Sequence, residues 1–381
     1  MNFLSGLSSV ATMGGGIGTL LAIMERAEHG GLDFFAVEAA GSVYLGVGEA
    51  QVATSDEQGS GPLFLESGFF PGSLLVRRFP VVVVAGTNRL EVEVFEGRPR
   101  DSDALSVAIG SAFPPARSSR LIELEQAMDS QVVRERIAVA VAQISSGNLT
   151  KLVVSAEEYY RRSFGFGVAR AAAKLKRSFQ RGHLYASPRA VGVSPELVLQ
   201  RIGDVVNLNP LAGTAGRGGQ VALLKSEKDQ WEHRVMVDQL ISDLGSLAKE
   251  INYPEHPVLF DAGRLIHLAT PIRGLVPPGV GFVELLLAIT PTAAIGGVPR
   301  KEAVEVLRVL EPDRGLYGGL VGLMAPDGDG EAYLAIRGAY FDGPTVRVVG
   351  GGGIVGSSLA EAEEEELRAK IQATAKVLAA G

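Results

Sequence analysis

From residue 121 onward, strand-like segments come in consecutive pairs, and amphipathic helices separate the pairs. Apolar residues at helical spacing predict helices at about 130–145, 165–182, 222–249, 300–310 and 358–379. Strands are predicted at 151–155, 183–193, 196–202, 204–209, 265–275, 316–324, 331–341 and 344–349. Two successive strands can pair as a hairpin, whereas a parallel pair needs a long crossover between them. The pattern therefore predicts an α+β fold with antiparallel sheets rather than a parallel βαβ sheet.

The N-terminal part of the chain, at about 33–96, also consists of short strand-like segments. Gly, Pro and Asn separate them, and the segments are DFFAVEAA, SVYLGVG, SLLVRRF, VVVVAG and RLEVEVFEG. The polar stretch 96–120, which contains Pro and Ser, is predicted to be a linker or a surface excursion. We expect a strand-rich portion, 1–120, that packs on the same fold as a second portion, 121–381.

Composition excludes several classes of function. The chain has 381 residues, 46% of them hydrophobic, which is enough for a full core, and its net charge of −7 comes without a basic cluster. Nucleic acid is therefore an unexpected partner. The absence of cysteine excludes disulfides, thiolate metal sites and cysteine nucleophiles, and it favours the cytoplasm. Apolar runs such as FPVVVVAG are too short to cross a bilayer, so we expect a soluble protein and no membrane partner.

Two acidic pairs have the spacing of one helix face. Glu363 and Glu366 are three residues apart, with Lys370 one turn further along the same stripe, and Asp229 and Glu232 repeat the spacing in another helix. If the two faces met, their oxygen ligands would suit Mg²⁺ better than zinc or a di-iron centre. The alternative for each pair taken singly is a solvated acidic surface.

A glycine-rich motif, GGGIVG at 351–356, formally satisfies the dinucleotide-binding pattern. It follows a strand and precedes a helix, but the sequence ends at 381, so no later strand can supply the acid that binds ribose. We therefore reject a nicotinamide cofactor. The glycines either admit a ligand carboxylate close to the backbone near a helix start or form a tight packing turn.

Four segments in order resemble the chorismate-utilising enzymes, the family of isochorismate, salicylate and anthranilate synthases. They are GVSPELVLQ (192–200), NPLAGTAGRG (209–218), EPDRGLYGGLVG (311–322) and AIRGAYFDG (335–343), and the glycine-rich segment and the acidic helix follow them. The resemblance covers about 120–381. It implies one α+β domain of two stacked, mostly antiparallel sheets flanked by helices, with the site between them.

The resemblance also implies site residues. Glu232 and Glu366 are similar to direct Mg²⁺ ligands, and Asp229 and Glu363 occupy positions that hold metal-bound waters. Relatives commonly carry Glu at the position of Asp229. The substrate carboxylates would be held by Arg337, Tyr317, Lys370 and the backbone from Gly351 to Gly353, while Gly213, Thr214 and His267 would line the ring. The substrate implied is chorismate, a dianion that an acid-rich site can bind only with help from Mg²⁺, Arg and Lys.

Two further residues resemble the family's acid–base pair. Lys151 matches the lysine that activates water in hydroxylating members, and Glu196 matches the acid that protonates the departing C4 hydroxyl. Read without the resemblance, Lys151 would be a strand-edge lysine facing solvent, and Glu196 an ordinary glutamate at a strand start. To be protonated near neutral pH, Glu196 must be desolvated or crowded by negative charge, which the acidic cluster and the substrate could supply.

Particular positions favour one branch of the family. Ala212 argues against aminodeoxychorismate synthase, and Lys151 argues against anthranilate synthase. The segments IHLATPIRG and PTAAIGGVPR, with Ile336, resemble isochorismate synthases, whereas Tyr317 is also used by salicylate synthases. The first expectation is an isomerase that makes isochorismate for menaquinone or a siderophore, as a monomer or weak homodimer. The second is a salicylate synthase, and a catalytically silent chorismate-binding relative is the third.

Overall fold

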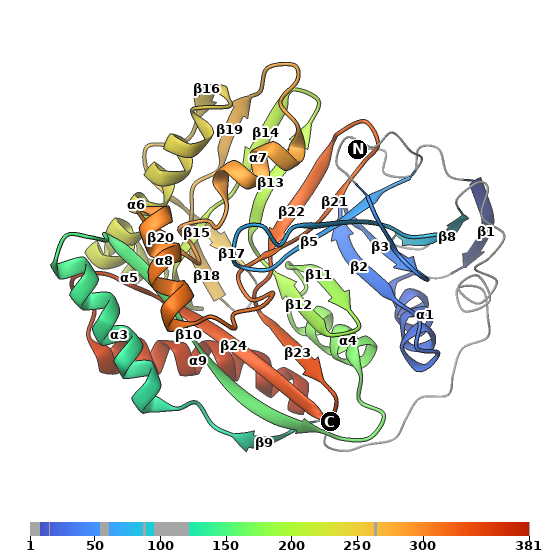
Figure 1. Ribbon diagram of the computed structural model, residues 1–381, viewed down its shortest axis with the longest axis horizontal. Coiled ribbons are helices and arrows are strands. Elements are labelled where there is room, and N and C mark those ends of the chain that lie inside the picture. The colour runs from blue at the N-terminus through green and yellow to red at the C-terminus, as the bar shows by residue number, and fades with distance from the viewer. Residues whose placement is uncertain are drawn as a thin grey trace.

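The structure, a computed structural model, describes residues 8–14, 16–53, 61–86, 89–94, 122–262 and 265–380. The strands form three sheets, and every pairing between neighbouring strands named below is antiparallel (Figure 1). The stretch 96–120, predicted to be a linker or surface excursion, lies outside the described residues. The division at residue 120 stays a prediction.

The largest sheet has twelve strands and contains segments from both ends of the chain. Its order is β1-β8-β7-β3-β2-β11-β12-β23-β24-β10-β20, with β9 paired to β10. The strands are β1 (Ser8–Gly14), β2 (Phe34–Ala39), β3 (Ser42–Val47), β7 (Val81–Ala85), β8 (Arg89–Val94), β9 (Ile122–Gln126), β10 (Lys151–Arg162), β11 (His183–Ser187), β12 (Ala190–Ser194), β20 (Gly297–Val298), β23 (Gly338–Asp342) and β24 (Thr345–Ile354). The pairing of β2 with β11 joins the N-terminal strands to the later ones.

The other two sheets have nine and three strands. The nine-stranded sheet runs β16-β19-β14-β13-β22-β21-β5-β6-β4, and the three-stranded sheet runs β15-β18-β17. Their strands are β4 (Gln51–Val52), β5 (Leu63–Ser67), β6 (Leu75–Arg78), β13 (Leu197–Ile202), β14 (Val205–Leu208), β15 (Leu211–Gly216), β16 (Lys249–Asn252), β17 (Val258–Asp261), β18 (Leu265–Ala269), β19 (Ile272–Leu275), β21 (Leu320–Met324) and β22 (Gly330–Leu334). The pairing of β5 with β21 again joins early and late segments.

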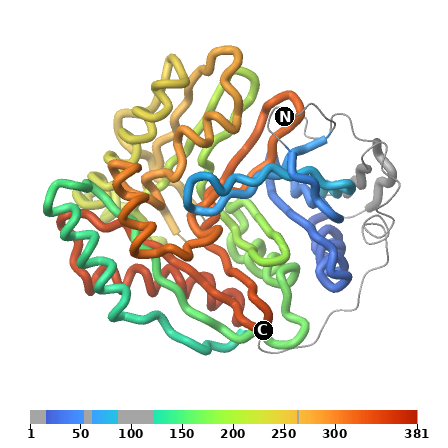
Figure 2. Tube along the Cα trace, viewed as in Figure 1, coloured from blue at the N-terminus to red at the C-terminus, as the bar shows by residue number. Residues whose placement is uncertain are grey.

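Helices flank the sheets, as the tube in Figure 2 also shows. The described helices are α1 (Ile17–His29), α3 (Ser130–Ser145), α4 (Val168–Ser178), α5 (Gln220–Lys225), α6 (Glu227–Leu244), α7 (Phe282–Ile289), α8 (Arg300–Leu310) and α9 (Ala360–Ala379). Helix α9 packs on β24 and against α3 and α4, while α6 packs on β15 and α7. Among the helices that the structure describes, none combines the length and hydropathy needed to span a bilayer.

The two large sheets stack, and alternate residues of β2 explain how. Phe34 and Ala36 point into the core beneath the helices, whereas Phe35 and Val37 point into a second core that side chains of both sheets fill. Phe64 of β5 meets Phe35 edge to face at 5.9 Å between ring centroids. Both faces of β2 are therefore buried, which explains its nearly continuous apolar sequence. The predicted α+β fold of two stacked antiparallel sheets flanked by helices is confirmed.

The sequence predictions differ from the structure in a few places. The helices predicted at 130–145 and 300–310 match α3 and α8. The segment 222–249, predicted as one helix, instead holds two, because Ser226 ends α5 and caps α6, where its side chain accepts a hydrogen bond from Asp229 N at 3.2 Å. Helices α1 and α7 were not predicted. Gly351, Gly352 and Gly353 belong to strand β24, which ends at Ile354 before α9 begins at Ala360, so the alternative of a tight packing turn was wrong.

Candidate active site

One cavity lies where the chain passes between the sheets. Glu196 connects β12 of the large sheet to β13 of the second sheet, and Arg337 connects β22 of the second sheet back to β23. Side chains from β10, β15, β18, β24, α6 and α9 complete the wall. Of the predicted site residues, the following line it: Lys151, Glu196, Gly213, Thr214, Asp229, Glu232, His267, Tyr317, Arg337, Gly351, Gly353, Glu366 and Lys370. Glu363 does not line it, and the chemical roles of all these residues stay predictions.

Lys151 is the first residue of β10 and is fully buried, at 0% exposure. Strand β20 pairs with it through Val298, so Lys151 is not at an open sheet edge. The interpretation as a strand-edge lysine facing solvent was therefore wrong. Its Nζ lies 2.9 Å from Glu232 Oε1, yet it reaches hydrogen-bond geometry with no group of the described chain. The amine is in charge contact with α6 without being held by an aligned hydrogen bond.

Glu196 is 5% exposed, and burial raises the pKa of its carboxyl to about 8. The positive charges of Lys151 and Arg337 and a hydrogen bond from the Leu211 backbone act in the opposite direction on this pKa. Desolvation alone therefore keeps the group protonated near neutral pH. Of the two causes expected from the sequence, desolvation is confirmed, while the strongest charges around Glu196 are positive rather than negative.

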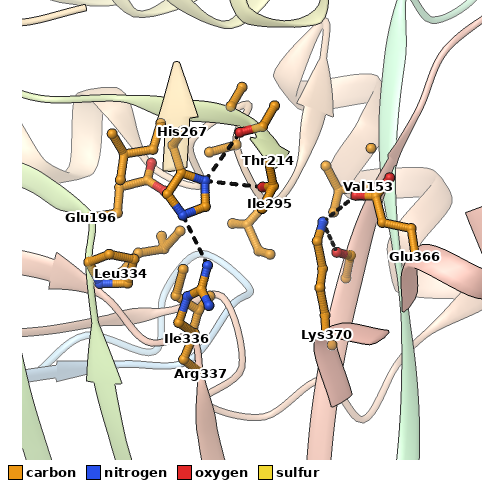
Figure 3. Close-up of a pocket in the computed structure, with 18 of the residues that line it drawn as sticks. Val153, Glu196, Thr214, His267, Ile295, Leu334, Ile336, Arg337, Glu366 and Lys370 are labelled. Carbon is orange, nitrogen blue, oxygen red and sulfur yellow. Dashed lines mark hydrogen bonds and ion pairs between the residues drawn. The ribbon is translucent and has the colours of Figure 1, made fainter. Parts of the chain in front are cut away.

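His267 connects Gly213 and Thr214 to Arg337 (Figure 3). Its Nε2 lies 3.1 Å from an Arg337 guanidinium nitrogen, and its Nδ1 lies 3.1 Å from the Gly213 carbonyl oxygen and 3.0 Å from Thr214 Oγ1. Because a guanidinium only donates, Nε2 accepts and the proton sits on Nδ1. Burial, aided by the charge of Arg337, lowers the pKa of His267 to about 3. The ring is neutral and is held in one tautomer.

Arg337 and Tyr317 approach the cavity from two loops. Arg337 has a φ of 51°, an unusual value for a residue with a side chain, which points to a backbone constrained by its surroundings. It donates to a neutral histidine rather than to a carboxylate, so its charge stays available to an anionic ligand. Burial raises the pKa of the Tyr317 hydroxyl, which keeps that group a neutral hydrogen-bond donor. Both features suit recognition of carboxylates.

The two acidic stripes converge from α6 and α9, and lysines contact their carboxylates. Glu232 contacts Lys151 at 2.9 Å, Glu363 contacts Lys228 at 2.5 Å, and Glu366 contacts Lys370 at 2.6 Å. Burial and the negative charges of Glu232 and Glu366 raise the pKa of Asp229. Burial would raise the pKa of Glu366 too, but the Lys370 charge and hydrogen bond lower it overall. The interpretation of each pair as a solvated acidic surface was wrong for the Glu363 carboxylate, which is 1% exposed.

Whether these residues fit a divalent cation can be tested on their geometry. Among the described residues, no three Asp, Glu or His side chains lie at mutual ligand distance, because the carboxylates turn toward the lysines. However, Glu363 Oε2 is buried and has no hydrogen-bond partner in the described chain, while its Oε1 accepts from Ser358 Oγ at 2.6 Å. A buried carboxylate oxygen left unpaired is costly unless a cation or its water satisfies it. In their chemistry, though not in their present distances, these carboxylate oxygens are the ligands that a hard cation prefers.

The glycines of β24 make room for these groups. A Cβ on Gly353 would overlap the Glu232 carboxylate and would lie 3.0 Å from Lys151 Cε. A Cβ on Gly351 would overlap the Tyr317 hydroxyl, and the Gly351 carbonyl accepts from Lys370 Nζ at 2.9 Å. Gly351 and Gly353 therefore let the Tyr317 hydroxyl and the Glu232 carboxylate come close to the backbone. The approach of a ligand carboxylate to this backbone stays a prediction.

Lys228 and Ser358 were missed by the sequence reasoning, although both bind Glu363. A signal for Lys228 was present, since it precedes Glu232 by four residues and so lies on the same side of α6. Ser358 lies five residues before Glu363, outside the helix, so only the folded geometry reveals its contact.

The sequence pattern of the chorismate binding enzymes matches residues 88–376. The chain belongs to this family. It is 33% identical over 253 residues to the isochorismate synthase DhbC of Bacillus subtilis, an alignment that spans 61% of this chain and 64% of the relative. It is 35% identical over 191 residues to the isochorismate synthase MenF of the same species, spanning 48% of this chain and 41% of the relative. The chain thus spans less than two thirds of the length of these two curated relatives.

Solved structures of family members share the fold. The structure of MenF, the menaquinone-specific isochorismate synthase from Escherichia coli, superposes with a TM-score of 0.80 at 18% identity and covers 98% of this chain and 95% of that one. Anthranilate synthase component I from Streptococcus pneumoniae superposes with a TM-score of 0.69, also at 18% identity, covering 90% and 89%. Because members with different products share the architecture, the fold does not select the reaction, and the residues in the cavity must do so.

Proposed function

We propose that this protein is an isochorismate synthase, which converts chorismate to isochorismate by adding water at C2 and releasing the C4 hydroxyl. The observation that carries the proposal is the pair formed by a buried amine, Lys151, and a buried protonated carboxyl, Glu196, in the wall of one cavity. A hydroxyl exchange needs both a base and an acid at the ring. The two similar curated relatives, both named isochorismate synthases, support the same reaction.

Lys151 is assigned the role of base. In this role its amine accepts a proton from water as the water oxygen attacks C2. Its Nζ lies 2.9 Å from Glu232 Oε1, so the contact with Glu232 must loosen for the amine to act. In the described chain no aligned hydrogen bond holds Nζ, so the ion pair with Glu232 is the contact that must open when the amine turns toward the ring.

Glu196 is assigned the role of acid. Its proton passes to the C4 oxygen as the bond from that oxygen to carbon breaks, and water leaves. A pKa of about 8 means that the group carries its proton at neutral pH and can give it up readily to the leaving C4 hydroxyl, which departs as water. The Leu211 N–H, which donates to the carboxyl group, stabilises the carboxylate formed after transfer.

We propose Mg²⁺ as the cofactor, held by Glu232 and Glu366, with Asp229 and Glu363 binding its waters. When bound, the ion would neutralise a substrate carboxylate. The chemistry of the donors supports this assignment, because all four groups offer carboxylate oxygens and Glu363 Oε2 is buried without a hydrogen-bond partner in the described chain. A divalent cation also matches the two negative charges of chorismate.

Substrate binding is assigned to the positive groups that face the cavity. Arg337 offers a guanidinium held by neutral His267, Tyr317 offers a neutral hydroxyl, and Lys370 can exchange Glu366 for a ligand carboxylate. Gly213, which bulges from β15 with a φ of 64°, and Thr214 support His267 beside the ring.

Product analysis tests the proposal. The protein is incubated with chorismate and Mg²⁺, and isochorismate, salicylate and pyruvate are measured. We expect isochorismate without pyruvate. Fluorescent salicylate with an equal amount of pyruvate would make the protein a salicylate synthase, whereas chorismate binding without turnover would make it a silent relative.

A further inference from the structure

A buried ion pair lies behind the cavity wall and is used by none of the steps above. Glu311 and Arg314 belong to the segment EPDRG, and their side chains are only 2% and 1% exposed. Arg314 Nε donates to Glu311 Oε2 at 2.6 Å. Neither residue lines the cavity. Their function must therefore lie in what they hold.

Arg314 binds the backbone of two cavity-lining segments at once. One terminal nitrogen of its guanidinium donates to the Ile295 carbonyl at 2.8 Å, and the other donates to the Val153 carbonyl. Val153 lies two residues after Lys151 on β10. In addition, the Arg314 carbonyl accepts from Tyr317 N at 3.2 Å. One residue thus connects the strand of the proposed base to the loop of a proposed substrate ligand.

Glu311 fixes the same strand at a second point. Its carboxylate accepts from both the backbone N and the hydroxyl of Ser155, at 2.8 and 2.5 Å. The Ser155 carbonyl in turn accepts from Arg136 of α3 at 2.7 Å. Strand β10 is therefore held at both Val153 and Ser155. Charge-assisted hydrogen bonds in a buried network restrict motion more than apolar packing does.

We propose that Glu311 and Arg314 are positioning residues, which set the place of Lys151 and Tyr317 relative to each other. The inference rests on the proposed function, because it assigns the pair to the proton transfer at Lys151. A buried ion pair is a poor source of stability, since apolar residues of similar size often replace one without loss. A displacement of about 1 Å in a catalytic group, by contrast, can reduce turnover roughly 10²-fold.

A pair of variants separates positioning from stability. Arg314→Met leaves the buried Glu311 with only Arg136, at 3.9 Å, as a counter-charge and so destabilises the fold. The double variant Glu311→Met/Arg314→Met removes both charges of the pair and should recover melting temperature. Arg77→Met is the matched control. Arg77 bonds Glu66 at 2.9 Å and stacks on Phe35 at 5.0 Å, much as Arg314 stacks on Phe69 at 4.3 Å. Unlike Val153 and Ile295, which Arg314 binds, neither Glu66 nor Phe35 lines the cavity.

We expect the double variant to melt near the wild type while its kcat for chorismate falls roughly 10–10²-fold, with a smaller change in KM. Arg77→Met should lower the melting temperature and keep kcat. Hydrogen exchange of the peptide 151–155 should be faster in the double variant and unchanged in Arg77→Met, whether or not the protein turns over chorismate. A double variant with wild-type kcat and wild-type exchange would overturn the inference. Wild-type protein without turnover would instead reject the proposed function, and the exchange comparison would still decide the positioning.

Discussion

The protonation state of Glu196 should determine how the activity depends on pH. Burial raises the pKa of this carboxyl to about 8, so about nine tenths of it is protonated at pH 7. An ordinary glutamate, with a pKa near 4.3, would be protonated in only about 0.2% of molecules at that pH. The fold therefore increases the fraction of Glu196 that is protonated at pH 7 by a factor of several hundred. Glu196→Gln keeps the size of the side chain but removes the transferable proton.

The assay is the initial rate of isochorismate formation as a function of pH. Because the protonated form is the active one, we expect kcat/KM of the wild type to fall as pH rises through about 8. Glu196→Gln should reduce turnover at pH 7 by roughly 10²–10⁴-fold and should lack this alkaline decline. Chorismate binding, measured by calorimetry, should persist.

A matched control distinguishes this role from a general effect of a buried carboxyl. Glu331 is buried to a similar degree and is bonded to Tyr333, Gln200 and the Ala40 backbone, outside the cavity. Glu331→Gln should keep the alkaline decline whatever it does to stability. If Glu196→Gln also keeps it, or turns over at a near-normal rate, the assignment of Glu196 as the acid is wrong.

Three other changes test separate parts of the site. Lys151→Ala should reduce turnover by roughly 10²–10⁴-fold through loss of the base. The control Lys176→Ala removes a lysine that pairs with Glu38 at 2.7 Å and does not line the cavity, and it should keep normal turnover. Equal activity of the two variants would remove Lys151 from the mechanism. Gly353→Ala should abolish activity because its Cβ overlaps the Glu232 carboxylate. Gly352→Ala, whose Cβ would lie 3.5 Å from Leu367, should be tolerated. Similar kcat values for the two variants would show that the close approach of Glu232 to the backbone at Gly353 is unimportant. Chelation with EDTA should abolish turnover and added Mg²⁺ should restore it, and full activity in EDTA would exclude a divalent cation.

The sequence predicted those parts of the molecule that depend on local pattern. Consecutive strand pairs predicted antiparallel sheets, and the helices at 130–145 and 300–310 match α3 and α8 residue for residue. Helix α7, FVELLLAI, was missed because apolar residues fill all but one position of a short run, which periodicity alone does not distinguish from a buried strand. The strand β15 was missed because Gly213 interrupts it with a bulge.

The site was predictable as a set of residues but not as a set of contacts. The order of the sequence motifs identified the residues that line the cavity. The pairing of Glu232, Glu363 and Glu366 with lysines depends on distances between α6, α9 and β10, which cannot be read from residue spacing in the sequence. The same holds for Glu196: a sequence can require desolvation of this carboxyl, but only the fold shows that burial outweighs two neighbouring positive charges. Arg314 lies within a segment that resembles the family, EPDRGLYGGLVG. Its hydrogen bonds to Val153 and Ile295 could not be predicted from the sequence, because they join segments far apart in the chain.

The most direct test of the account is the origin of the oxygen at C2. The protein is incubated with chorismate and Mg²⁺ in water labelled with heavy oxygen, and the product is analysed by mass spectrometry. If Lys151 activates water while Glu196 releases the C4 hydroxyl, each isochorismate molecule gains one labelled oxygen. Unlabelled isochorismate, or no product at all, would contradict the account.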